Sequence, residues 1–462
     1  MRYVDNKAEE LKIAYIGGGS KGWAWGLMSD LATSGDMSGD VYLYDIDFEA
    51  AKANEVIGNK FNNLKEAVSN WNYHAVETIG EALSGADFVV ISILPGTLDE
   101  MESDVHAPEK YGIYQSVGDS TGPGGIVRAM RTIPMYEGFA RDIEKYCPDA
   151  WVINYTNPMT LCIKALYDTF PKIKAFGCCH EVFGTQKILA KMLKEMKGID
   201  APRNEMKVNP IGVNHFTWVT KANYKNIDLY PLYKEFTEKY KEGLEQAGDD
   251  NWLNNHFRSA EKVKFELFRK YGIIAAAGDR HLAEFCPGYW YLENPERVEE
   301  MKFSLTPVSF RKEDLYAKRI KKSEKLLSGE LDVEIANTGE EGVDQMRALL
   351  GLGDFVTNVN VPNVGQIPNL PLGAVVETNA VFSADRVTPV CAGEVPKEIY
   401  SLISRVVGVQ ELTAEGIKER NIEKIFLAFA NDPLVTCGLT DARKLFDEMV
   451  ENTKEYLTMF NL

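Results

Sequence analysis

The chain is short of basic residues and of long apolar runs. It has 51 lysines and arginines against 68 aspartates and glutamates, a formal net charge of −17 over 462 residues. Binding to nucleic acid or to an anionic membrane needs a basic surface, so neither partner is expected. No run of apolar residues approaches the length of a membrane span, and residues 1–10 are polar, unlike a signal peptide. We therefore expect a cytoplasmic protein.

Cysteine is also scarce, and its number is odd. The seven cysteines are scattered, except for the neighbours Cys178 and Cys179. In a chain of this length, an odd number argues against a disulfide framework and favours a reducing compartment. The remaining composition, 45% hydrophobic and 26% charged, is that of an ordinary globular protein. The length allows two or three domains with substantial cores.

The first 180 or so residues alternate short apolar runs with helical spacing. Buried parallel strands are expected at residues 11–16, 41–44, 87–93, 151–153 and 173–176. Between them, residues 47–65 and 128–146 have helical length and spacing. This βαβ alternation predicts an α/β fold with a Rossmann-type doubly wound parallel sheet.

The pattern changes after about residue 200. Residues 206–212 and 216–222 are expected as paired strands around a turn at 213–215. Further elements are expected as helices at roughly 230–271, 295–328, 396–430 and 439–459, and as a proline-interrupted β-rich stretch at 355–380. The chain is thus divided into a Rossmann-like domain, residues 1–200, and a C-terminal α+β domain, residues 201–462.

A glycine-rich loop follows the first expected strand and opens a helix. Its G-x-G-x-x-G pattern consists of Gly17, Gly18, Gly19, Ser20, Lys21 and Gly22. Glycines let the backbone approach a pyrophosphate, and the helix N-terminus offers free N–H groups. Asp45 ends the next strand, where a carboxylate accepts ribose hydroxyls and repels a 2′-phosphate, which favours NAD over NADP. Asp47 is the alternative for that role, Pro95 is expected near the nicotinamide, and a structural glycine turn is the alternative to the whole site.

A thiol, an imidazole and a carboxylate stand in consecutive positions at Cys179, His180 and Glu181. Neighbouring residues point in different directions, so Cys179 pairs more naturally with His215 from the 213–215 turn. One thiolate, one imidazole and open positions suit a divalent metal that substrate oxygens complete, Mn²⁺ being one candidate. The alternative is that Cys179 is a small core residue, His215 a turn residue and Glu181 a solvated carboxylate.

Three further segments carry candidate substrate contacts. Asp279 is a candidate base, and Arg280 is a candidate for holding a substrate carboxylate through two hydrogen bonds. A surface ion pair is the alternative for these two residues. Asn157 follows a strand and precedes a proline, at the sheet edge where substrates bind. Asp119 belongs to the glycine-rich loop of residues 118–125, expected beside the cofactor, and is counted with the substrate residues.

Together these motifs resemble family 4 of the glycoside hydrolases, the NAD-dependent glycosidases. The segments that carry the resemblance are residues 17–22, 121–125 with Arg128, 131–134, 157–158, 179–180, 212–218 and 363–377. The resemblance implies a fold similar to lactate and malate dehydrogenases, bound NAD, usually Mn²⁺, and a homodimer or homotetramer. One departure concerns residues 95–104. Many members of the family have an arginine in this region that contacts substrate, and this chain has no arginine there.

The resemblance also implies roles for individual residues. Cys179 and His215 match the family's metal ligands, and Asn157 matches a substrate position. Asp279 matches the base of the branch that acts on non-phosphorylated α-glycosides, and His180 stands where its α-specific members are thought to supply the acid. Residues 179–182, Cys-His-Glu-Val, are similar to the α-galacturonidases, a subgroup assignment that depends on Glu181.

The implied reaction is a redox elimination on a small uronide. Hydride leaves C3 for NAD⁺, Asp279 takes the C2 proton, the leaving oxygen departs with acid help from His180, water adds, and hydride returns. We therefore predict an α-galacturonidase. The alternatives are an α-glucosidase, α-galactosidase or α-glucuronidase of the same family, an NAD-dependent 2-hydroxy-acid dehydrogenase, or a silent NAD-binding sensor. The dehydrogenase alternative does not explain why the chain would have Cys179 and His215 as a pair of metal ligands.

Overall fold

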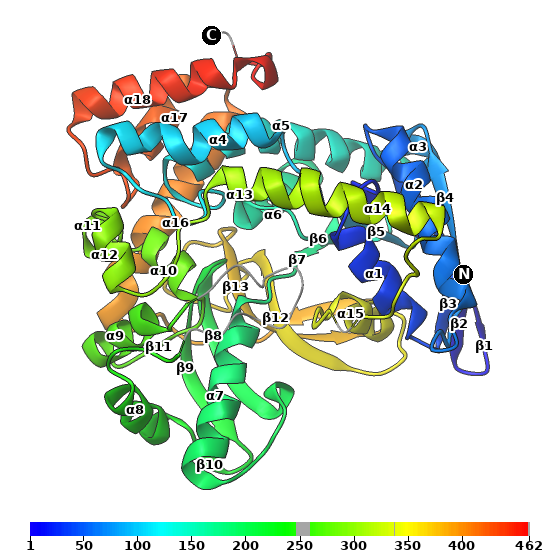
Figure 1. Ribbon diagram of the computed structural model, residues 1–462, viewed down its shortest axis with the longest axis horizontal. Coiled ribbons are helices and arrows are strands. Elements are labelled where there is room, and N and C mark those ends of the chain that lie inside the picture. The colour runs from blue at the N-terminus through cyan, green and yellow to red at the C-terminus, as the bar shows by residue number, and fades with distance from the viewer. Residues whose placement is uncertain (246–258, 337, 461–462) are drawn as a thin grey trace.

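One mixed β-sheet runs through the protein (Figure 1). The computed structural model describes residues 1–245, 259–336 and 338–460. The sheet has 14 strands, in the order β10-β9-β8-β13-β12-β7-β6-β5-β2-β3-β4 with β1, β11 and β14 paired at its sides. The strands are β1 (Arg2–Val4), β2 (Lys7–Ile16), β3 (Met37–Tyr44), β4 (Trp71–Val76), β5 (Phe88–Ile91), β6 (Trp151–Asn154), β7 (Lys174–Gly177), β8 (Met206–Val213), β9 (Phe216–Tyr224), β10 (Ile227–Asp228), β11 (Ile274–Ala275), β12 (Phe355–Pro362), β13 (Val375–Ser383) and β14 (Arg386–Pro389).

The N-terminal part of this sheet is parallel, with the order β4-β3-β2-β5-β6-β7. The chain builds outward from β2 in one direction and then returns to build from β5 in the other. Ligands bind at such a switch point, outside the carboxyl ends of the strands. The predicted doubly wound fold is confirmed. Strand β4 was not predicted, because its apolar and polar residues alternate at an edge instead of forming the apolar run of a central strand.

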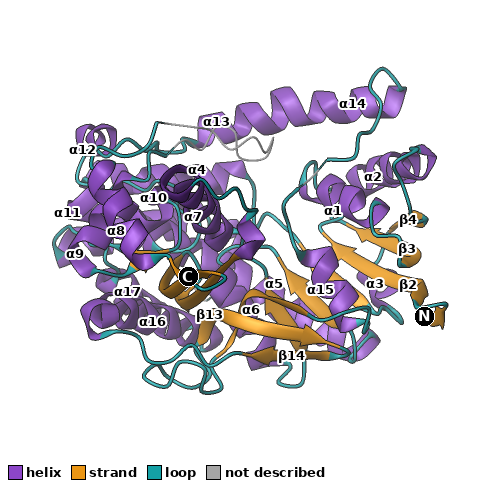
Figure 2. Ribbon diagram, turned by 90° about the horizontal axis from the view of Figure 1, so that it is seen from below, coloured by secondary structure: helices purple, strands orange, loops and turns teal. Residues whose placement is uncertain are grey.

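Alternation along the strands explains why both faces of the sheet are covered. In β2, Ile13 and Tyr15 point into one apolar cluster, whereas Ala14 and Ile16 point into the other. The first cluster includes residues of helices α1 (Trp23–Ala32), α2 (Phe48–Lys60) and α15 (Gly342–Leu349). The second includes residues of helices α3 (Ile79–Leu83), α5 (Gly122–Tyr146), α6 (Met159–Thr169) and α16 (Lys397–Lys418). Figure 2 shows the sheet between these layers of helices. A strand buried on both faces needs continuous apolar sequence, which is the pattern that predicted it.

The C-terminal part extends the same sheet with antiparallel strands. Asn360 of β12 pairs with Gly177 of β7, and β13 then joins β12 to β8. The predicted hairpin of β8 and β9 is confirmed, with its turn at Asn214 and His215. The proposed division near residue 200 falls between α7 and β8 and stays a prediction, since the sheet itself continues across it.

The helices are α1 (Trp23–Ala32), α2 (Phe48–Lys60), α3 (Ile79–Leu83), α4 (Leu98–His106), α5 (Gly122–Tyr146), α6 (Met159–Thr169), α7 (Glu181–Lys197), α8 (Tyr230–Lys239), α9 (Lys262–Tyr271), α10 (Asp279–Phe285), α11 (Gly288–Tyr291), α12 (Pro295–Glu300), α13 (Val308–Lys312), α14 (Ile320–Ser328), α15 (Gly342–Leu349), α16 (Lys397–Lys418), α17 (Ile422–Asn431) and α18 (Leu439–Asn452), with a π-helical turn, η4 (Glu313–Arg319), between α13 and α14. Among the helices of the described residues, none combines the length and the apolar character that crossing a membrane requires.

Several predicted helices are wrong in extent, for local reasons. The helix expected at 295–328 is broken after α12, and Pro307, which has no N–H to donate, starts the next helix. The helix expected at 396–430 is two helices, because Arg420 takes a left-handed φ of 55° and Asn421 caps α17. The stretch expected at 230–271 contains α8 and α9, and its residues 246–258 lie outside the described part of the chain.

Candidate active site

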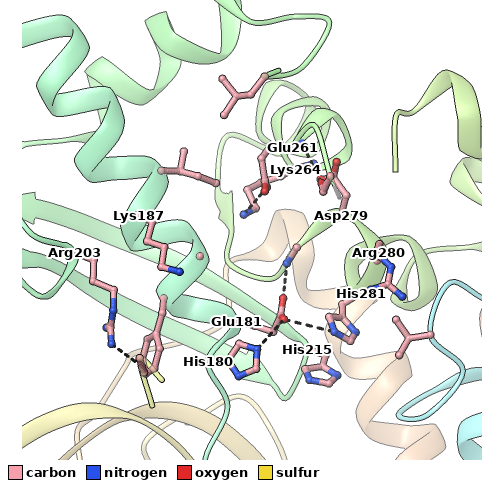
Figure 3. A pocket seen from close by; sticks show the side chains of 18 of the residues that line it. His180, Glu181, Lys187, Arg203, His215, Glu261, Lys264, Asp279, Arg280 and His281 are labelled. Carbon is pink, nitrogen blue, oxygen red and sulfur yellow. Dashed lines mark hydrogen bonds and ion pairs between the residues drawn. The ribbon is translucent and has the colours of Figure 1, made fainter. Parts of the chain in front are cut away.

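A cavity of about 430 Å³ lies beside the carboxyl ends of the parallel strands. Its walls come from the start of α7, the β8–β9 turn, α10, α13 and the loop before α15. The predicted site residues that line it are Asp119, Asn157, His180, Glu181, His215, Asp279 and Arg280. Figure 3 shows Glu181 between His180 and His281, with Asp279, Lys264 and Glu261 grouped nearby. The structure thus brings segments that are distant in sequence into one pocket.

His215 is held in the tight turn between β8 and β9 with a left-handed φ of 64°. The Ser120 hydroxyl donates to Asp119 Oδ1 at 2.7 Å and lies 3.1 Å from His215 Nδ1. A hydroxyl has one hydrogen and the carboxylate accepts it, so His215 Nδ1–H must donate to Ser120. Burial, then the neighbouring His281, lowers the pKa of His215 to about 3. The result is a neutral imidazole whose Nε2 can bind a metal, with Asp119 placed behind it.

Cys179 follows β7 and is buried, and unlike the other predicted site residues of this region it is not among those that line the cavity. Asn358 Nδ2 donates to the Cys179 carbonyl at 3.1 Å and to Glu377 Oε1 at 2.6 Å. Burial, and then the charges of Glu377 and Glu181, raise the pKa of the Cys179 thiol well above its ordinary value. A nearby cation would relieve this repulsion, so the donor set of Cys179 and His215 fits a borderline divalent ion. The described residues contain no cluster of three or more His, Cys, Asp or Glu arranged to hold a metal.

Glu181 begins α7 and joins it to α10. Its Oε2 accepts from Gly278 N at 2.7 Å, and its Oε1 lies 3.6 Å from His281 Nε2 and 3.9 Å from His180 Nε2. Burial alone raises the pKa of Glu181, but His281, His180 and His215 outweigh it and bring the pKa to about 2. Glu181 is therefore an ionised acceptor in the pocket wall and not a solvated helix-start carboxylate.

Two residues of this cluster were missed from the sequence. His281 stacks on His215 with 3.8 Å between ring centroids, and its buried Nδ1 has no partner among the described residues. His281 directly follows the predicted residues Asp279 and Arg280 in the sequence, and this position was the signal that could have identified it. Glu340, from the loop before α15, places Oε1 3.1 Å from His180 Nδ1. Nothing in the sequence near Glu340 indicates that contact.

Asp279 is fully buried at the start of α10. Its Oδ1 accepts from Lys264 N at 2.9 Å, and its Oδ2 has no hydrogen-bond partner within the described ranges. Lys264 also pairs with Glu261 at 2.8 Å. Burial, and then the charge of Glu261, raise the pKa of Asp279 to about 7. A carboxylate with a free oxygen and a pKa near neutrality is suited to removing a proton.

Arg280 and Asn157 line the cavity in different ways. The Arg280 guanidinium donates from Nε to Ser304 O at 3.0 Å and from Nη2 to Ser116 O at 2.8 Å. Asn157 accepts at its carbonyl from Arg128 Nε at 3.0 Å, whereas its buried Oδ1 has no partner among the residues described. Asn157 Oδ1 can therefore accept a hydrogen bond from a ligand, whereas two donors of Arg280 are already bonded to backbone carbonyls of the protein.

The glycine loop lies at the switch point, between β2 and α1. At Gly17, with φ 92°, a Cβ would stand 2.0 Å from Ser92 O, so only glycine fits. Within the described part of the chain, no side chain hydrogen-bonds at the N-cap of α1, so the N–H groups of its first turn can bind an anion. Asp45 Oδ2 accepts from Gly19 N at 2.9 Å, and Asp47 caps α2 by accepting from Ala50 N. These residues fit a dinucleotide.

Two neighbours complete this region. Ile46, between the two aspartates, is 96% exposed and was not predicted, although an apolar side chain there can cover a flat base. The Pro95 carbonyl accepts from Arg131 Nε at 3.5 Å, and Arg131 forms a buried ion pair with Asp104 at 2.5 Å. The Pro95 loop is therefore anchored to α5 at the edge of the sheet.

Fold and pocket together define a Rossmann-type α/β enzyme with a charged pocket at its strand ends. Residues 12–195 match the model of the family 4 glycosyl hydrolases, and residues 210–435 match its C-terminal domain. The chain belongs to family 4 of the glycosyl hydrolases.

Individual proteins agree with this assignment. An α-galacturonidase of Thermoanaerobacterium saccharolyticum is 61% identical over 99% of this chain and 98% of its own. The crystal structure of a putative glucosidase, lplD, from Bacillus subtilis has a TM-score of 0.90 and 52% identity over 96% of this chain and all of its own. A 6-phospho-β-glucosidase from Thermotoga maritima, solved with manganese, NAD⁺ and glucose 6-phosphate, has a TM-score of 0.75 and 22% identity over 96% of this chain and 99% of its own, which is a likeness of fold.

Proposed function

We propose that this enzyme hydrolyses α-galacturonides by redox elimination. The observation that carries the reaction is the convergence of Asp279, His180 and His215 on one cavity at the carboxyl ends of the parallel strands. The substrate class is supported by the relative that is 61% identical and named α-galacturonidase, since it aligns over nearly the whole of both chains. Glu181, the residue that indicated this subgroup, lies inside the pocket wall.

Two groups would be held by residues that fit them. Residues 17–22 and Asp45 would hold NAD, which would supply a hydride acceptor and donor. Cys179 and His215 would hold a divalent metal, which would supply Lewis-acid chemistry.

The protein's own residues handle the protons. Asp279 removes the C2 proton with its unpartnered Oδ2. The Glu340 carboxylate lies 3.1 Å from His180 Nδ1, where its charge favours the doubly protonated imidazolium. The Nε2–H of that imidazolium is the donor to the leaving oxygen. Asn157 offers its Oδ1 to a sugar hydroxyl, and Asp119 holds the tautomer of His215 through Ser120.

A panel of aryl α-glycosides tests the function. The galacturonide, glucuronide, galactoside and glucoside are compared with NAD⁺, Mn²⁺ and a reductant present. We expect the galacturonide to be hydrolysed fastest, with no net NADH formed. Faster hydrolysis of a neutral glycoside would overturn the substrate class, and net NADH from simple 2-hydroxy acids would favour a dehydrogenase.

Replacing Glu340 should affect proton donation more than binding. In Glu340→Leu, His180 loses the acceptor that orients its ring, so kcat for a galacturonide with a poor leaving group should fall roughly tenfold or more. A p-nitrophenyl galacturonide needs little acid help and should change by about twofold at most. Glu340→Gln keeps an acceptor oxygen and should restore most of the loss. Equal losses on both substrates would show that Glu340 only supports the fold.

A further inference from the structure

A galacturonide carries a C6 carboxylate, which needs a cation in the pocket. The basic side chains that line the cavity are Lys187, Lys191, Arg203, Lys264, Arg280 and Arg311. Lys264 is paired with Glu261, and Arg203 with Glu341 at 3.0 Å. Arg280 donates to two backbone carbonyls. Lys187 and Lys191 are exposed on α7, where water screens their charge.

Arg311 of α13 differs from these. Within the described residues it forms no hydrogen bond or ion pair, and its Nε is buried without a partner. Burial lowers the pKa of Arg311, while the charges of Asp119 and then Glu284 oppose that shift. Arg311 as a whole is half-buried, and its buried Nε is a donor whose burial is costly unless an acceptor arrives. A bound carboxylate is the acceptor whose planar shape matches the guanidinium.

The position of Arg311 is rigidly supported. Val308, one turn earlier, is buried against Leu98, Met101 and Val105 of α4. Lys312 pairs with Asp99 of α4 at 2.7 Å and also with Glu102. The segment before α13 is fastened as well, since Thr306 N donates to Ser116 O and Arg280 donates to Ser304 O. Arg280 therefore helps to hold the strap that carries Arg311.

Carboxylates of the protein lie near Arg311. Asp119 is ionised, with a pKa of about 2, because the nearby Arg128, His215, Arg311 and His281 outweigh its burial. Glu284 Oε1 accepts from Val117 N and Gly118 N, and burial raises the Glu284 pKa to about 7. Arg280 and Arg311 thus face carboxylates on this side of the pocket, and the Nε of Arg311 still has no partner within the described residues.

We propose that Arg311 binds the C6 carboxylate of the uronide and so determines the preference for galacturonides over galactosides. The inference rests on the proposed function and names the cation that its substrate requires. Arg280 serves a different purpose, as a positioning residue for the strap of residues 304–307.

The test compares two substrates that differ only at C6, an aryl α-galacturonide and the corresponding α-galactoside. Arg311→Met should lower kcat/KM for the galacturonide roughly 100-fold, chiefly through KM, and leave the galactoside within about twofold. Arg311→Lys should retain part of the preference, because it keeps a charge but not the two-donor geometry. Added guanidinium should partly restore Arg311→Ala.

Two control variants separate this role from general damage. Lys318→Met removes an exposed charge from the same helical segment and should change neither substrate. Arg280→Met loosens the strap and should weaken both substrates together. Equal losses on both substrates in Arg311→Met, or an unchanged preference, would overturn the inference. A wild type that hydrolyses the galactoside but not the galacturonide would instead overturn the proposed function.

Discussion

Asp279→Asn is expected to lower kcat for an aryl α-galacturonide by roughly 1,000-fold, while NAD and metal still bind. The amide cannot accept the C2 proton, although it can still accept the hydrogen bond from Lys264 N. In deuterated solvent, the product of the wild type should carry deuterium at C2, and the variant should release almost no deuterated product. The measurement is mass spectrometry of the product sugar beside the steady-state rate.

The same residue sets a pH dependence. Because the pKa of Asp279 is about 7, activity should fall as the pH drops through about 7 and the base is protonated. The folded pKa is raised above the ordinary value of 3.8, so the folded state binds the extra proton between these pH values. The free energy of unfolding therefore falls as the pH rises from about 3.8 to about 7 and stays lowered above that, so Asp279→Asn should melt higher than the wild type at pH 8.

These two results together identify the base. Loss of activity with a gain in stability excludes misfolding as the cause. Asp332→Asn, at an exposed position, is the matched control and should leave both properties unchanged. Undiminished C2 exchange in Asp279→Asn would mean that another group takes the proton.

Removing the metal or its ligands is expected to have the second large effect. A chelator should abolish hydrolysis, and Mn²⁺ should restore it. Cys179→Ala and His215→Ala should each lower Mn²⁺ affinity at least about 100-fold, measured by calorimetry or electron paramagnetic resonance. Binding of NAD, followed by its own titration, should persist because the glycine loop is untouched.

The neighbouring cysteine provides the control for this experiment. Cys178 Sγ donates to Gln345 Oε1 at 2.9 Å, so Cys178→Ser keeps a donor and should keep the metal. If Cys179→Ala and His215→Ala both kept full Mn²⁺ affinity, the proposal that these two residues bind the metal would be wrong.

Much of the fold was predictable because its signals are local. Parallel strands that are buried on both faces appear in the sequence as apolar runs. The glycines of residues 17–22 predict that the backbone can closely approach a bound pyrophosphate. Strand β4 and the breaks at Pro307 and Arg420 were missed. An edge strand has no continuous apolar run, and a helix end depends on caps and neighbours as much as on spacing.

The sequence by itself determined which chemistry the chain carries: a glycine loop with Asp45, a thiol beside an imidazole at Cys179 and His180, and a candidate base at Asp279. Only the tertiary structure decided which partners these groups have. It placed Glu340 against His180, stacked His281 on His215, and bonded Arg280 to backbone carbonyls, while Arg311 Nε has no acceptor among the residues that the structure describes. The reason is that a residue type sets the bonds a side chain can form, whereas packing of distant segments sets which of them are already made.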